Sequence, residues 1–221
     1  MTWSMNERRA IAAAALVAAV VSAAHGPVLA SAEPKEVVQS TANAVIAVLR
    51  DGKLDRDAKQ ARIEEIVYAA VDFDTLSRLV LARNWKRFNE AQRGEFLSEF
   101  KRHLSVTYGK NIDDYRNETV DITGEREETR GDHTVLSKIV RGAGSAEFQV
   151  NYRLRQKDGR WQIIDVIVEG VSMVANFRSQ FQDIVASGGP DRLLRLLREK
   201  NASGESLIPT TPRPRQASDA S

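Results

Sequence analysis

The spacing of apolar residues changes twice along this chain, and the order of the changes limits the folds that it can adopt. From about residue 35 to residue 115, apolar residues recur every three or four positions, which is the spacing of one face of a helix. From residue 118 to residue 169 they alternate with polar residues, as in strands that are covered on one side. The helical spacing then returns. Helices, consecutive strands and helices again indicate an α+β fold.

Four helices are expected before the strands, over residues 33–50, 56–71, part of 72–85 and roughly 90–115. Asp72 or Asp74 would be the N-cap of the third helix, because a side-chain oxygen at that position can accept a hydrogen bond from the first turn. The first helix is amphipathic, with an apolar stripe made of Val37, Val38, Ala42, Val45, Ile46 and Leu49.

Four strands are expected from the alternating segments 118–125, 133–140, 146–156 and 160–169. Asp158-Gly159 should join the last two as a tight hairpin, since this pair favours a two-residue turn. The third strand is apolar on one side and polar on the other. We therefore expect helices to pack on one face of a roughly four-stranded antiparallel sheet. Two further helices follow the sheet, with Gly188-Gly189-Pro190 between them.

The last strand is apolar on both sides and continues across Glu169-Gly170 into a helix. Strict alternation would place Ile164, Val166 and Val168 on one face, and Trp161, Ile163, Ile167 and the acid Asp165 on the other. Such apolar side chains could form ordinary core or the wall of a ligand cavity. The residues alone leave both interpretations open.

Residues 1–32 have the features of an export signal. Arg8 and Arg9 precede an apolar stretch, residues 10–24, which is shorter than the roughly 20 residues that span a bilayer. Ala30 and Ala32 occupy the small-residue positions before a cleavage point, so we expect cleavage after Ala32.

Residues 202–221 are rich in Pro, Ser and Thr, and they are expected to form a disordered tail. Residues 33–201 would then form a single domain.

The composition gives no support for nucleic-acid binding or for a zinc site. Removal of residues 1–32 takes two arginines and one glutamate from 32 basic and 30 acidic residues, so the mature chain has a net charge of +1. This balance gives no reason to expect a nucleic-acid partner. The chain has no cysteine and only three histidines, one of which lies in the signal, so a zinc site is not expected either.

We find no signature of a catalytic site. His103 lies between Phe100 and Leu104 in the longest helix, and we interpret it as an interfacial or exposed histidine rather than a catalytic base. Ser172 follows a strand and a turn, as a nucleophilic serine would, but Val174 replaces the second glycine of G-x-S-x-G. Ser172 is therefore interpreted as a helix-start serine.

Arg178 has two open interpretations. It lies between Phe177 and Phe181, on a helix stripe that should be buried. An arginine there could extend its charged end to solvent. Alternatively, it could form a structural ion pair with a residue such as Glu169, or contact an anionic head group.

Three long segments of the chain carry a more specific signal. They read "VDFDTLSRLVLARNWKRFNEAQRGEFLSEFKRHLSVTYGKNIDDY", "VNYRLRQKDGRWQIIDVIVEGVSMVANFRSQFQDIV" and "GPDRLLRLLREKN". In this order they resemble the MlaC family of periplasmic phospholipid-binding proteins, also called toluene-tolerance proteins, over approximately residues 35–201. One departure is Ala82, which stands where the family often has a glycine before an arginine.

The resemblance implies a soluble carrier of the Mla system. Such a protein takes a diacyl phospholipid between an outer-membrane lipoprotein complex and an inner-membrane ABC transporter complex, and so helps to maintain the lipid asymmetry of the outer membrane. It also implies a curved sheet with acyl chains in an apolar cavity between sheet and helices, without catalysis or a cofactor. No metal-binding residue is assigned, and Arg178 is the one candidate for a head-group contact. The expected lipid-binding residues are Leu79, Val80, Leu104, Tyr108, Ile112, Phe148, Val150, Tyr152, Ile164, Val166, Val168, Val171, Val174 and Phe177.

Two other functions compete with a carrier. An enzyme of isomerase or hydratase type on a cone-shaped α+β scaffold would need a buried acid or base, and Asp165 is the only acid within the pattern of the last strand. An interaction module without a ligand would instead have a solid core.

Overall fold

The computed structural model describes residues 32–109, 117–140 and 147–207. Its elements in chain order are α2 (Pro34–Arg50), α3 (Arg56–Ala70), α4 (Phe73–Leu81), the 3-10 helix η1 (Ala82–Arg87), α5 (Glu90–Tyr108), β1 (Thr119–Glu127), the 3-10 turn η3 (Thr129–Gly131), β2 (His133–Val140), β3 (Glu147–Lys157), β4 (Arg160–Val168), β5 (Val171–Ser172) and α6 (Met173–Ser203).

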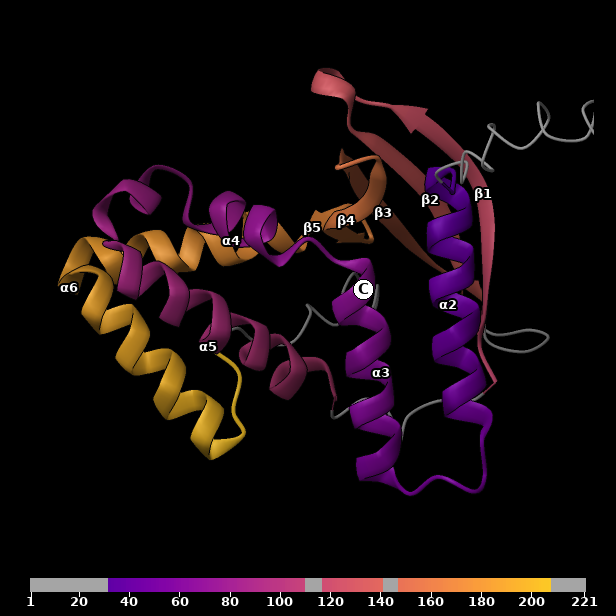
Figure 1. Ribbon diagram of the computed structural model, residues 1–221, viewed down its shortest axis with the longest axis horizontal. Helices are drawn as coiled ribbons and strands as arrows, with labels where there is room; N and C mark the ends of the chain where they lie inside the picture. The colour runs from indigo at the N-terminus through magenta and orange to yellow at the C-terminus, as the bar shows by residue number, and fades with distance from the viewer. Residues whose placement is uncertain (1–31, 110–116, 141–146, 208–221) are drawn as a thin grey trace, which may run out of the picture. The chain divides into compact units, whose positions relative to one another are not determined.

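The strands form one antiparallel sheet in the order β1-β2-β3-β4-β5, and α2 lies along it (Figure 1). This confirms the α+β fold and adds one short strand to the expected four. The extra strand arises at Glu169-Gly170, where φ values of 49° and 79° make a tight turn that pairs Val171 with Val168. Asp158-Gly159, with φ values of 50° and 75°, makes the expected hairpin between β3 and β4.

A bulge in β4 changes which of its side chains share a face. Ile163 and Asp165 pair with consecutive residues of β3, so Ile164 between them is an extra residue. The prediction that Ile163 and Val166 lie on opposite faces is therefore wrong, because the bulge shifts the alternation by one. At the bulge the Ile163 carbonyl accepts a hydrogen bond of 3.0 Å from the N–H of Asp72, which ties the start of α4 to the sheet.

The buried apolar side chains form two separate clusters. The larger lies among α4, α5 and α6 and holds five of the seven phenylalanines in the chain: Phe88, Phe96, Phe100, Phe177 and Phe181. The smaller lies between α2 and the sheet, where its fully buried members are Val38, Val135, Leu154 and Ile163. The apolar stripes of α5 and α6 thus cover each other, and α2 is the helix that covers the sheet.

Two helix starts follow directly from their capping residues. Asp72 is the N-cap of α4, since its carboxylate accepts from the Thr75 N–H at 3.0 Å, which decides between the two predicted candidates. Asn89 and Gln92 form a capping box at the start of α5.

The chain remains ordered beyond the expected end of the domain at Asn201. Non-helical backbone at Gly188 and Gly189 divides α6 into two segments, as expected, and the second segment runs to Ser203. Leu207 then packs against the larger cluster. Residues 208–221 of the predicted tail lie outside the described residues.

His103 holds this C-terminal segment in place. Its Nε2 accepts a hydrogen bond from the Leu207 N–H at 3.1 Å, so the ring proton is on Nδ1 and is donated to Asn201 Oδ1 at 2.9 Å. The side chain is completely buried, which corrects the expectation of an interfacial or exposed histidine. Burial lowers the pKa of His103, since the charged imidazolium would lose its hydration and could not accept from Leu207.

This geometry makes the stability of the fold dependent on pH. The unfolded chain protonates His103 below its ordinary pKa of about 6.5, whereas the folded protein keeps the ring neutral to lower pH. The free energy of unfolding should therefore fall as the pH drops below about 6.5, by at most about 1.4 kcal/mol per pH unit. Urea unfolding at pH 8 and pH 5.5 measures the effect, and His103→Gln should have a flatter pH dependence. An equally steep dependence in His103→Gln would contradict this role.

Ala82 ends α4 in a backbone conformation that suits glycine. Its φ of 46° and ψ of −121° lie in a region that side chains with a Cβ rarely occupy. The residue at which the chain departs from the family pattern is thus one where a glycine would relieve strain.

Ala82→Gly should raise the free energy of unfolding, by roughly 1 kcal/mol, despite the greater flexibility of glycine in the unfolded chain. The matched control is Ala61→Gly on the exposed side of α3, which should lower it by about the same amount. Urea denaturation of both variants is the measurement. Destabilisation by both would show that Ala82 is unstrained.

Candidate functional site

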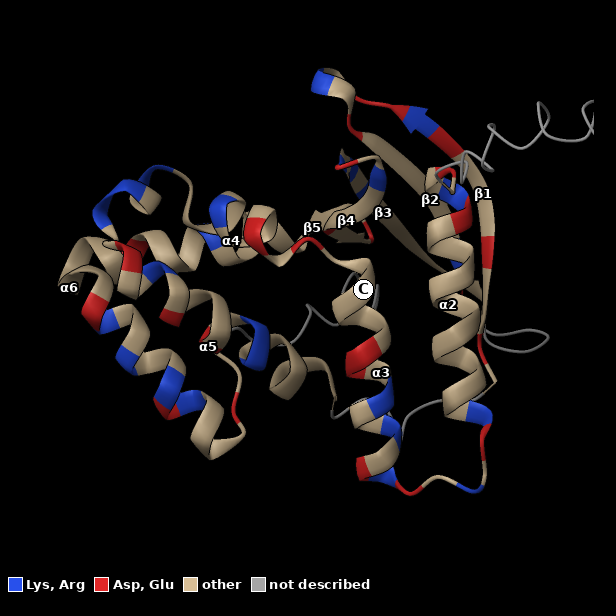
Figure 2. Ribbon diagram, in the orientation of Figure 1, with Lys and Arg blue, Asp and Glu red and all other residues tan. Residues whose placement is uncertain are grey.

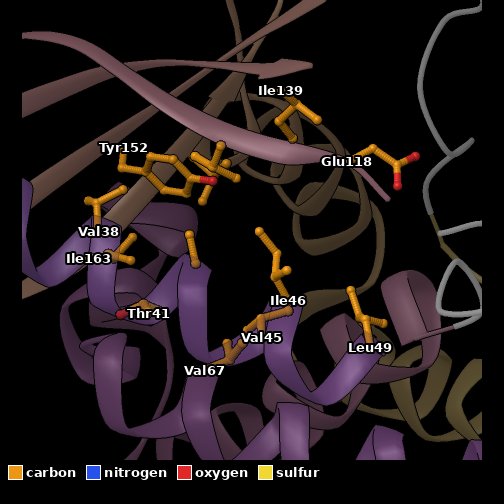
Figure 3. A pocket seen from close by; sticks show the side chains of 13 residues that line it. Val38, Thr41, Val45, Ile46, Leu49, Val67, Glu118, Ile139, Tyr152 and Ile163 are labelled. Carbon is orange, nitrogen blue, oxygen red and sulfur yellow. The ribbon is translucent and has the colours of Figure 1, made fainter. Parts of the chain in front are cut away.

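A cavity of about 560 Å³ lies between α2 and the sheet (Figure 3). One face of α2 forms a long side of it, because its lining residues recur at helical spacing: Val38, Thr41, Ala42, Val45, Ile46 and Leu49. Lys35, Glu36 and Arg50 are the charged residues of α2, and they lie at its ends (Figure 2). The middle of the helix is therefore free to face an apolar space.

The opposite side of the cavity comes from four strands, and α3 adds a residue beside α2 (Figure 3). Val120, Ile139, Tyr152, Ile163 and Val166 belong to β1, β2, β3 and β4, and α3 contributes Val67. Side chains of α2 and of the sheet point toward each other across the space (Figure 3). The bulge in β4 matters here, since it brings both Ile163 and Val166 to this face.

Among the described residues that line the cavity, three carry a polar group on the side chain: Thr41, Glu118 and Tyr152. The Thr41 hydroxyl donates to the Val37 carbonyl within its own helix at 2.6 Å, so its proton is not available to a ligand. Burial raises the pKa of Tyr152, which is therefore neutral at physiological pH. The cavity wall is thus almost entirely apolar, as a site for hydrocarbon requires.

The profile of the family described as "MlaC protein" matches residues 39–199, which contain nearly all of this fold. The chain belongs to the MlaC family.

Curated relatives and a solved structure agree with this membership. The chain is 27% identical to toluene tolerance protein ttg2D of Pseudomonas putida, over 74% of this chain and 78% of that protein. It is 22% identical to the intermembrane phospholipid transport system binding protein MlaC of Haemophilus influenzae, over 77% of this chain and 83% of that protein. A phospholipid-binding protein of Ralstonia solanacearum, solved in complex with a phospholipid, has the same fold, with a TM-score of 0.70 and 22% identity over 78% of this chain and 99% of that one.

Within this MlaC-family fold, two of the residues predicted to bind lipid line the cavity, Tyr152 and Val166. Most of the others lie elsewhere. Val80, Val174 and Phe177 are buried in the larger cluster, and Leu79 and Leu104 pack against it. The sequence prediction thus assigned to one cavity several residues that the structure uses to pack α4, α5 and α6 together.

The other residues that were predicted to bind lipid, as far as the structure describes them, are not part of the cavity lining. Val150 and Ile164 are buried in the sheet, Phe148 and Val168 are half-buried, and Tyr108 and Val171 are exposed. Ile112 lies outside the described residues. The turn at Glu169-Gly170 explains the position of Val171, because it reverses the chain before α6 begins.

The lining residues that the sequence analysis missed are concentrated on α2. Their signal was the stripe from Val38 to Leu49, which the sequence identified as the apolar face of an amphipathic helix without linking it to a cavity. These side chains are mostly half-buried even though they face the sheet, whereas the phenylalanines on the facing stripes of α5 and α6 are fully buried. Incomplete burial of an inward face is the feature that distinguishes a cavity wall from a core.

Arg178 is held by the backbone of α4. Its Nε donates to the Leu79 carbonyl at 2.9 Å, which satisfies a carbonyl near the C-terminal end of α4. Among the described residues it has no ion pair, and the Glu169 carboxylate accepts instead from the Gln149 N–H. Arg178 does not line the apolar cavity.

Asp165, the acid on which an enzyme would have depended, organises the start of α6. It is buried, and its carboxylate accepts from the Val174 N–H at 3.0 Å and from the Ser172 hydroxyl. Ser172 is the N-cap of α6, as predicted, and accepts from the Ala175 N–H. In the part of the chain that the structure describes, no three His, Asp or Glu residues come together as a metal site. No helix described here is both long and apolar enough to cross a membrane.

Asp165→Ala should lower the free energy of unfolding by about 1–3 kcal/mol, because it leaves a buried N–H of α6 without an acceptor. Asp165→Asn keeps one acceptor oxygen and should lower it less. Asp183→Ala, at an exposed position of α6, is the control and should change it by no more than about 0.5 kcal/mol. Urea denaturation compares the three, and an Asp165→Ala variant as stable as the control would contradict the structural role.

Proposed function

We propose that this chain is a periplasmic phospholipid carrier of the Mla system, and that the cavity between α2 and the sheet holds acyl chain. It would move lipid between an outer-membrane lipoprotein complex and an inner-membrane ABC transporter complex, and so maintain outer-membrane lipid asymmetry. The observation that carries the proposal is the apolar cavity in an MlaC-family chain. The names of the H. influenzae and R. solanacearum proteins support it, since both refer to phospholipid.

The length of the cavity suits one acyl chain lying along α2. Val38 and Leu49 are eleven residues apart on this helix, which corresponds to about 16 Å at 1.5 Å per residue. The hydrocarbon core of a bilayer is about 30 Å thick, so an acyl chain in one leaflet spans about 15 Å. A chain that fills the cavity would therefore be covered over most of its length.

The apolar wall supplies the free energy that a carrier needs. Exposing a methylene to water costs about 0.8 kcal/mol, so an acyl chain of about 16 carbons would cost on the order of 12 kcal/mol without cover. Burial of this kind is non-directional, and the wall has few groups that could fix one chain length. We expect lipids with different acyl chains to bind, with the head group toward solvent.

The proposed location rests on the N-terminal sequence. Residues 1–32 have the features of a signal peptide, with cleavage expected after Ala32, and they would direct export to the periplasm. Two features favour a carrier over the competing functions. Asp165 is engaged in capping α6, which disfavours an enzyme, and the cavity disfavours a module with a solid core.

Filling the cavity from α2 should abolish lipid binding. Ala42→Trp places an indole in the cavity, and we expect it to carry at least fivefold less co-purified phospholipid than wild type. Ala47→Trp puts the same side chain on the exposed side of the same helix and should carry as much as wild type. Native mass spectrometry of freshly purified protein, with circular dichroism to verify folding, makes the comparison.

Two outcomes would contradict the proposal. One is wild-type protein that is free of lipid and cannot take it up from vesicles. The other is a folded Ala42→Trp variant that carries as much lipid as Ala47→Trp.

A further inference from the structure

A second hollow, of about 440 Å³, lies between the junction of α4 with η1 and the first segment of α6. It shares no lining residue with the apolar cavity. Four of its lining side chains are polar, Arg83, Asn84, Arg178 and Gln182, and Leu81 is its largest apolar one. Each of these four side chains has at least one group that can donate hydrogen bonds, and none is acidic.

The charge of the hollow is not compensated by its surroundings. Arg83 makes no hydrogen bond or ion pair with any described residue, and the one bond of Arg178 uses only Nε. The terminal nitrogens of both guanidinium groups therefore have no protein acceptor in the described part of the chain. Lys86 and Arg87 on η1 are exposed and likewise unpaired there, so the segment between α4 and α5 is largely blue in Figure 2.

Arg178 and the η1 segment beside the hollow are held in place before any ligand binds. The bond from Arg178 Nε to the Leu79 carbonyl fixes the plane of its guanidinium. On η1, the ring of Trp85 contacts the guanidinium groups of Arg78 and Arg93, which lie 4.7 and 5.0 Å from the ring centre. Arg93 also donates to the Trp85 carbonyl at 3.1 and 3.3 Å, which attaches η1 to α5. Such preorganisation lowers the entropy cost of binding.

The donor set selects the class of ligand. Guanidinium groups present forked donors that match the oxygens of phosphate and carboxylate. A phosphate group offers up to four acceptor oxygens and a carboxylate two, so phosphate can engage more of the four donor side chains at once. The apolar residues in its lining are Leu81, Ala82 and Ala186, a smaller apolar set than that of the cavity beside α2.

We propose that this hollow is an anion-binding site that takes a phosphate group between Arg83 and Arg178, separate from the apolar cavity. The phosphate could be free in solution or belong to the head group of an anionic lipid in a membrane surface. The site does not depend on the proposed carrier function, since its residues do not contact the apolar cavity.

The first test is a titration of the isotope-labelled protein with inorganic phosphate, followed by the NMR signals of the residue 82–84 amides and of Arg178 Nε–H. We expect saturable shifts in wild type, with at least tenfold weaker binding in Arg83→Gln, because each charge-assisted hydrogen bond contributes strongly. Arg160→Gln, which removes an exposed arginine at the start of β4, should bind as wild type does. Chloride at matched ionic strength should cause no saturable shift.

The second test distinguishes the two sources of phosphate. Flotation with phosphatidylcholine vesicles, with and without phosphatidylglycerol, is compared for wild type, Arg83→Gln and Arg160→Gln. Binding that needs phosphatidylglycerol and is lost only in Arg83→Gln would assign the site to a head group, and no vesicle binding would assign it to free phosphate. The proposal is overturned if inorganic phosphate and chloride act alike, or if Arg83→Gln binds phosphate as tightly as wild type. Because the exposed Arg83 side chain makes no hydrogen bond or ion pair with a described residue, its substitution should leave the melting temperature unchanged.

Discussion

Five phenylalanine rings pack on one another in the core formed by α4, α5 and α6, with neighbouring ring centres 5.0 to 5.8 Å apart. The rest of the structure depends on this contact. Large aromatic side chains contribute most to the burial of apolar surface, and here they are gathered on the side away from α2. The layer between α2 and the sheet has two aromatic side chains, Tyr152 and Trp161, among mostly aliphatic ones, and a cavity lies within it. A chain with no cysteine can thus keep a stable fold and still contain an apolar cavity.

Two of the contacts that join the halves lie close together in β4. The Ile163 carbonyl bonds to the Asp72 N–H where α4 begins, and Asp165 binds the first turn of α6. Both contacts arise at the bulge of β4, so a single extra residue in one strand positions the helical core and turns Ile163 and Val166 toward the cavity. The bulge therefore links the scaffold to the proposed lipid site.

Much of the fold could be predicted from the sequence, because the spacing of apolar residues and the residues that favour turns depend only on nearby positions in the chain. Asp158-Gly159, the Asp72 cap and the order of elements follow from neighbouring residues. The site could not be predicted in the same way. The apolar stripe of α2 would have the same sequence pattern if it packed against another element or lined a cavity. In the same way, the apolar side chains of Val174 and Phe177 are compatible with a cavity wall and with a core. No sequence feature near Ile164 indicates the bulge either. Strict alternation of side chains along β4 therefore placed some of its residues on the wrong face of the sheet.

The central claim is that acyl chain lies between α2 and the sheet. The most direct measurement uses a phospholipid with a photoreactive group on its acyl chain, loaded into the protein, irradiated and mapped by mass spectrometry of the cross-linked peptides. We expect cross-links on α2 between residues 38 and 49 and on the facing positions of β1 to β4. Cross-links confined to α4, α5 and α6, around Val80 and Phe177, would contradict the claim.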